Sequence, residues 1–126
     1  MKRLVLILAG AAALSGCSVQ PAETVSGTLA ISLSSPFVDD GALLLTLSGG
    51  PVDSVETTGY TLYSSRLDAN TLEMIVTGQL TSGTIARVHI ADERLAPQYS
   101  VKVLQAAAQS SYTQRDPSAY GVTLAP

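Results

Sequence analysis

The chain has 126 residues, with seven basic and ten acidic side chains and a net charge of −3. This length fits one ordinary domain, and the scattered cations argue against a nucleic-acid partner, because such binding needs clustered Lys and Arg. The single cysteine excludes an internal disulfide and a thiolate metal cluster, and no motif calls for a cofactor.

The first segment has the composition of a secretory leader. Lys2 and Arg3 precede an apolar run over residues 4–14, and the sequence LSGC follows at residues 14–17. A positive start, an apolar core and small residues before a cleavage site define a signal peptide. The run of about eleven residues is short for a transmembrane helix, which needs roughly twenty. This segment resembles the lipobox signal peptide of bacterial lipoproteins.

The resemblance implies a diacylglycerol on the sulfur of Cys17, cleavage before Cys17, and acylation of the new N-terminus, with palmitate as a typical acyl group. Two or more acyl chains give stable membrane anchoring. Ser18 follows the cysteine, and an aspartate there would favour retention at the inner membrane. We therefore expect a lipid anchor in the bacterial cell envelope, at the outer membrane rather than the outer face of the inner membrane. An ordinary signal peptide cut elsewhere and a buried core helix are the alternatives.

These features divide the chain into three parts. We expect a signal peptide at 1–16, a lipidated N-terminus and tether at 17–26, and a β-sandwich domain at 27–126. Removing the leader, which holds two basic residues and no acidic one, leaves five basic and ten acidic groups, a net charge near −5. Anionic headgroups would mildly repel such a domain, so the lipid would have to supply the anchoring.

Short alternating runs separated by turn signals follow the tether. The expected strands are residues 28–33, 42–48, 52–55, 60–64, 71–80, 84–90, 99–108 and 118–124. The tail of the seventh run, at 105–109, has helical propensity and could form one turn of helix. Seven or eight short strands at intervals of roughly ten residues predict an all-β sandwich of the immunoglobulin-like or jelly-roll kind.

The order of some runs adds a second resemblance. Residues 41–47, 52–55, 74–78 and 85–90 are similar in strand order to cohesin-like β-sandwich modules, which serve in extracellular protein attachment. The resemblance covers about half of the mature chain, implies the fold, and assigns no binding residue.

His89 is the only histidine. Alternation places it in a strand, on the side opposite the apolar face. Ser34 or Ser35 with Asp39 could complete a Ser-His-Asp triad, but no nucleophile-elbow sequence is present. We expect a solvated strand-face histidine, with a small hydrolase as the alternative.

Acidic residues gather before and after the second expected strand. Asp39 and Asp40 precede Gly41, and Asp53 and Glu56 lie in the next loop region. Calcium takes six to eight oxygen ligands, so these side chains are candidates for part of a calcium site. The alternative is that Asp and Gly simply form turns here.

Three residues near the C-terminus are candidates for a protein-binding patch. Tyr112, Arg115 and Tyr120 combine residue types that are favoured at protein interfaces. The alternative is that these tyrosines cover sheet edges.

These observations favour a membrane-anchored envelope lipoprotein whose non-enzymatic β-sandwich binds another envelope protein or supports an assembly. A calcium- or glycan-binding module is the alternative from a different class. The glycan version is weakened by the low aromatic content of 5% without tryptophan.

Overall fold

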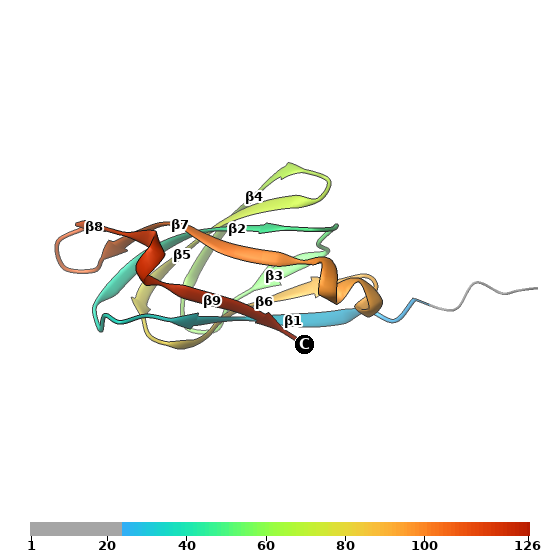
Figure 1. Cartoon of the computed structure of the whole chain (residues 1–126), viewed down its shortest axis with the longest axis horizontal. Helices are drawn as coiled ribbons and strands as arrows, with labels where there is room; N and C mark the ends of the chain where they lie inside the picture. Colours follow the sequence, from blue (N-terminus) through green and yellow to red (C-terminus); the bar gives the residue numbers. More distant parts are fainter. Residues whose placement is uncertain (1–23) are drawn as a thin grey trace, which may run out of the picture.

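Residues 24–126 are the part of the chain that the computed structural model describes, and they form two antiparallel β-sheets packed face to face (Figure 1). One sheet has the strand order β3-β6-β1-β9, and the other has the order β4-β5-β2-β7-β8. The elements are β1 (Gly27–Ser34), β2 (Asp40–Ser48), β3 (Ser54–Glu56), β4 (Thr61–Asp68), β5 (Thr71–Leu80), β6 (Gly83–Ile90), the 3-10 helix η1 (Glu93–Gln98), β7 (Ser100–Ala108), β8 (Gln114–Arg115), the 3-10 helix η2 (Pro117–Ala119) and β9 (Gly121–Ala125).

The predicted all-β sandwich is confirmed. The expected leader and Cys17 lie outside the described residues. Within residues 24–126, no helix combines the length and the apolar character needed to cross a membrane.

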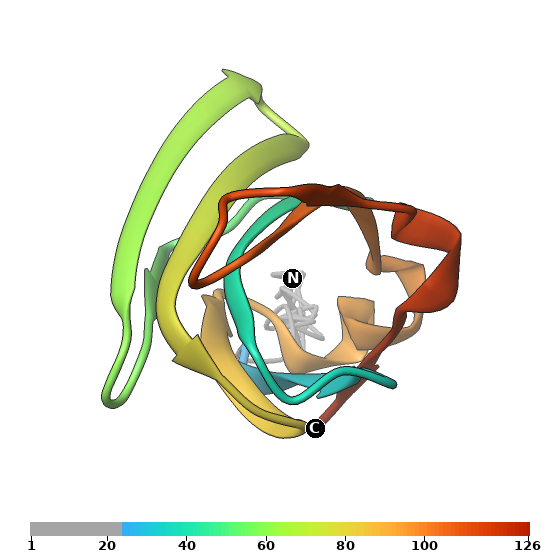
Figure 2. The ribbon, with the colours of Figure 1, turned by 90° about the vertical axis from the view of Figure 1, so that its left-hand side faces the viewer.

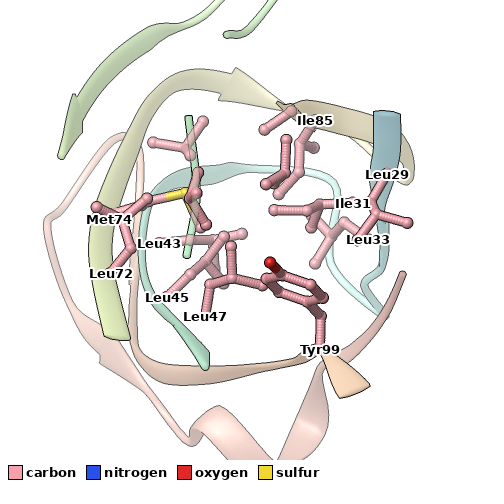
Figure 3. Packing of buried hydrophobic residues seen from close by; sticks show 14 of the residues in the cluster. Leu29, Ile31, Leu33, Leu43, Leu45, Leu47, Leu72, Met74, Ile85 and Tyr99 are labelled. Carbon is pink, nitrogen blue, oxygen red and sulfur yellow. The ribbon is translucent and has the colours of Figure 1, made fainter. Parts of the chain in front are cut away.

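The core forms where alternate residues of both sheets meet. Three strands bury a side chain at every second position. These are Leu29, Ile31 and Leu33 in β1, Leu43, Leu45 and Leu47 in β2, and Leu72, Met74 and Val76 in β5. Figure 3, which labels all of these residues except Val76, shows the labelled side chains pointing from the two layers toward one another. Each buried aliphatic side chain contributes about 1.5–3 kcal/mol relative to exposure. The period-two pattern of the sequence therefore sets which face of each strand turns inward.

The C-terminal third differs from expectation in two places. The turn of helix considered at 105–109 is wrong, because β7 continues to Ala108 and pairs there with β2, Ala107 lying opposite Ala42. Cross-strand pairing overrides the weak helical propensity of this segment. The last strand begins at Gly121 rather than at residue 118, because residues 117–119 form η2.

Strand β7 contains an extra residue that reverses its alternation. In β7, Val103 lies opposite Leu45 and Gln105 lies opposite Leu44, so Leu104 is unpaired with β2. Such a bulge shifts the following side chains to the other face. Val103 before the bulge and Ala106 after it therefore both face the core, although an odd number of positions separates them.

The two ends of the sandwich carry different parts of the chain. The chain enters β1 at Gly27 at one end, together with η1 (Figure 1). The loops at 35–39 and 109–113 lie at the opposite end, where β1 and β7 finish. We call the two ends the entry end and the far end.

Candidate functional site

A second bulge places an acidic residue in the core of the far end. Ala42 lies opposite Ala107 of β7, and Asp40 lies opposite Ala108, so Gly41 is an extra residue in β2. Without it, the alternation of the leucines in β2 would turn residue 40 outward. A Cβ on Gly41 would lie 2.5 Å from the Cα of Gln109, so the close approach of the two segments requires glycine here.

Asp40 is completely buried, and both of its carboxylate oxygens accept hydrogen bonds. Oδ1 accepts from Nη1 of Arg115 at 3.0 Å and from the hydroxyl of Tyr120 at 2.6 Å. Oδ2 accepts from the hydroxyl of Ser35. A buried carboxylate is tolerated when it is paired and hydrogen-bonded in this way.

Arg115 connects this buried acid to the surface. Its Nη2 donates to Oδ1 of Asp39 at 2.6 Å, while its Cζ lies 4.0 Å from the centroid of the Phe37 ring. Phe37 in turn packs against Tyr120, with ring centroids 5.9 Å apart. The guanidinium therefore makes ion pairs and a cation–π contact at the same time. We use the name Asp40 cluster for the six residues joined by these contacts, which are Ser35, Phe37, Asp39, Asp40, Arg115 and Tyr120.

The environment of the cluster raises the pKa of two side chains, Tyr120 and Arg115. Burial and the hydrogen bond to Asp40 raise the pKa of Tyr120 to about 12, although nearby Arg115 acts in the opposite direction. The hydrogen bond to Asp39 raises the pKa of the Arg115 guanidinium above its usual value. At neutral pH, the tyrosine is a neutral donor and the arginine a fixed cation.

The Asp40 cluster joins segments that are far apart in the sequence. Ser35, Phe37 and Asp39 belong to the loop between β1 and β2, whereas Arg115 and Tyr120 flank η2. Backbone contact adds to this, since the N–H of Gln109 donates to the carbonyl of Asp39 at 2.7 Å. The cluster therefore fixes both loops of the far end relative to the sandwich.

The calcium candidates are only partly brought together. Asp39 and Asp40 are adjacent in space, but both carboxylates are directed at Arg115. Asp53 and Glu56 lie beyond the other end of β2, a nine-residue strand that spans about 30 Å. Within residues 24–126, no group of three or more His, Cys, Asp or Glu side chains is arranged to hold a metal ion.

The expected patch of Tyr112, Arg115 and Tyr120 does not form as a continuous surface. Tyr112 is 81% exposed, but Tyr120 is buried, and the side chain of Arg115 is turned toward the two acids. Tyr112 lies in the loop between β7 and β8 with a φ of 54°, a left-handed conformation uncommon for a non-glycine residue. The N–H of Tyr112 donates to the carbonyl of Ala108 at 3.1 Å, which helps to hold this loop in place.

His89 lies far from the serines considered for a triad. In the pairing of β1 with β6, His89 is opposite Thr28 at the entry end. Its Nε2 lies 2.9 Å from Oε1 of Glu56, and its Nδ1 lies 3.2 Å from Oγ1 of Thr28. Ser35 follows the other end of β1 and bonds to Asp40 instead. The structure therefore does not assemble the Ser-His-Asp arrangement considered from the sequence.

Two residues of the far end were not singled out from the sequence. Phe37 belongs to the Asp40 cluster, and Val38 is 87% exposed beside it. Ser35, considered from the sequence only as a triad nucleophile, is instead a hydrogen-bond donor to Asp40. One sequence feature could have indicated Phe37 and Val38. They are adjacent apolar residues between a proline and two aspartates, in a turn segment where polar residues are the usual choice.

No family model, curated protein or solved structure matches the chain. The likeness to lipoprotein signal peptides and to cohesin-like modules stays a prediction.

Proposed function

We propose that this protein is a bacterial envelope lipoprotein, anchored through acylated Cys17, whose non-enzymatic sandwich binds another protein at its far end. The observation that carries the binding part is the set of exposed apolar side chains on two fixed loops. Val38 is 87% exposed, Tyr112 is 81% exposed, and Phe37 is 37% exposed.

The anchoring part follows from the leader and from the end at which the chain enters the fold. Nine residues, 18–26, separate the lipidated cysteine from β1, a length that spans at most about 30 Å. The N–H of Glu93 in η1 donates to the carbonyl of Val25 at 2.8 Å, so the last part of this segment is fixed to the entry end. The membrane would then lie on the entry side, and the far end would point away from it.

The far end has the chemistry of a protein-binding surface. Exposed aromatic and aliphatic side chains grouped on a soluble domain mark interaction sites more often than scattered ones do. Tyrosine is also enriched among the residues that dominate binding energy. The Asp40 cluster holds the two loops in one arrangement before binding, which lowers the entropy lost on association.

Site-specific photo-crosslinking in cells tests this proposal. A photoreactive amino acid is placed at Val38 or at Tyr112 in the full chain, with Arg94 in η1 as the control position, because its side chain is 60% exposed at the entry end. We expect the same protein adduct from both far-end positions and none from Arg94. Adducts of equal yield at all three positions, or none at the far end, would contradict the proposal.

A further inference from the structure

The last part of the chain, residues 114–126, connects the two sheets along one side of the sandwich. It begins as β8 in the five-stranded sheet, continues through η2, and ends as β9 in the four-stranded sheet. We call it the C-terminal segment. Figure 2 shows this segment, in red, running along the outside of the molecule to the C-terminus. Both of its strands lie at sheet edges, so each of them pairs with one neighbouring strand.

The C-terminal segment adds little to the core. Among residues 114–126, Tyr120 is the one buried residue, at 8% exposure. Val122 and Leu124 of β9 are only partly buried against the core. In contrast, β2 buries alternate side chains and pairs with a strand on each side. Because stabilisation grows with the apolar area removed from water, β9 is held more weakly than β2.

The Asp40 cluster holds the C-terminal segment to the sandwich on both sides of η2. Arg115 before η2 and Tyr120 after it both donate to the completely buried carboxylate of Asp40. Hydrogen bonds to ionised groups are stronger than those between neutral groups, and β8 adds only two paired residues. The N–H of Ser118 donates to the carboxylate of Asp116, so this bond at η2 stays within the segment.

We infer that residues 114–126 detach from the sandwich as one unit while the other strands stay folded, and that the contacts to Asp40 control this opening. Proteins open in such units at free energies below that of global unfolding. Once Arg115 and Tyr120 leave Asp40, β9 keeps five paired residues with β1. The loop at 109–113 is the hinge, because it connects β7 to β8.

Detachment changes the strand edges of the molecule. β1 lies between β6 and β9, so the loss of β9 makes β1 an edge strand. The stretch of β1 that β9 covers, residues 30–34, contains neither a charged residue nor a proline, the residues that usually protect an edge. The open form therefore presents a strand-pairing edge that the closed form covers. This opening depends neither on the anchor at Cys17 nor on a partner at the far end.

Amide hydrogen exchange of the full chain, purified in detergent, tests the inference. Mass spectrometry of peptides from β9 and from β2 follows the uptake of deuterium. We expect the protected amides of β9 to exchange faster than those of β2, because β9 opens without global unfolding. Exchange in β9 as slow as in β2 would overturn the inference.

A substitution in the part that stays folded separates the two kinds of opening. Val76 is completely buried in β5, which is separated from β8 by β2 and β7. Val76→Ala should speed exchange in β2 on the order of tenfold, because it makes global unfolding easier. Exchange in β9 should not change, because Val76 stays buried when the segment detaches. Equal acceleration of β2 and β9 would overturn the inference, since β9 would then open only with the whole fold.

A second substitution tests the role of the Asp40 cluster. Arg115→Ala removes the ion pairs with Asp39 and Asp40, and it should speed exchange in β9 on the order of tenfold, although Arg115 lies outside β9. Lys102→Ala, which removes an exposed cation from β7, is the matched control and should leave exchange in β9 unchanged. Unchanged exchange in β9 of Arg115→Ala would overturn the inference, because β9 would then fray by itself.

Discussion

Arg115 donates a 3.0 Å hydrogen bond to a carboxylate oxygen of Asp40, a residue 75 positions earlier in the chain that has no solvent exposure. This contact fastens the C-terminal segment to the start of β2. Among the residues described, no buried side-chain polar atom lacks a hydrogen-bond partner, so the Asp40 cluster is both polar and fully satisfied. Such networks fix one arrangement of a core, but they are sensitive to the loss of any member.

Asp40→Ala should strongly destabilise the fold. The substitution leaves the hydroxyl of buried Tyr120 without its acceptor, and an unsatisfied buried donor costs about 1–3 kcal/mol. Arg115 also loses one of its two acidic partners and keeps Asp39. Denaturant unfolding followed by circular dichroism measures the change. Glu56→Ala, which removes an exposed partner of His89, is the control and should have little effect. Equal effects of the two substitutions would contradict a structural role for the cluster.

Gly41→Ala tests the bulge that turns Asp40 inward. The new Cβ would lie 2.5 Å from the Cα of Gln109, so β2 and the loop after β7 would have to separate. We expect a loss of about 1–3 kcal/mol, as for other overpacked sites. Gly121→Ala is the control, because its Cβ would lie 3.6 Å from the nearest atom of Ser34, an ordinary contact. A Gly41→Ala protein as stable as Gly121→Ala would contradict the close approach.

The raised pKa of Tyr120 predicts that the fold loses stability at alkaline pH. Its pKa is raised to about 12, whereas an unfolded tyrosine titrates near 10, so the folded state holds this proton more tightly. The contribution is fully present below about pH 10 and is lost as pH rises toward 12, by up to about 2–3 kcal/mol. The unfolding free energy of the unmodified chain should therefore fall more steeply over this range than that of Tyr120→Phe. Tyr112→Phe should follow the unmodified chain, and identical slopes for all three would contradict the prediction.

Calcium should not raise the melting temperature of the protein. Asp39 and Asp40 are both engaged by Arg115, and this cation occupies the position that a metal ion would need. Thermal unfolding with millimolar calcium and with a chelator measures the effect. A calcium-dependent rise that disappears in Asp39→Ala would contradict this prediction and restore the calcium-binding alternative.

The strands could be predicted from the sequence because their signal is local. In β1, β2 and β5, large apolar residues recur at every second position, although Leu44 and Ile75 add apolar residues on the outward face. Turn residues stand between the runs, so the strands and their inward faces follow from period two. The burial of Asp40 could not be predicted in this way. It depends on one extra residue in β2 and on partners that only the tertiary fold brings near.

The same limit explains the two hypotheses built on the far end. From the sequence, Asp39 and Asp40 were candidates for calcium, and Arg115 and Tyr120 for an exposed patch. The two pairs are about 75 positions apart, so nothing in the sequence indicated that they meet. In the fold, Arg115 forms ion pairs with both aspartates. Tyr112 alone stays exposed, since its loop projects beyond the cluster. β8 was also missed, because a two-residue strand carries no periodic signal.

The intact mass of the protein recovered from the membrane fraction, measured beside a Cys17→Ala form, tests the anchoring claim most directly. We predict a mature chain that starts at Cys17 and carries two or three acyl chains, and a Cys17→Ala chain that stays unprocessed. An unlipidated chain cut at another residue, with Cys17→Ala processed in the same way, would contradict the lipoprotein proposal.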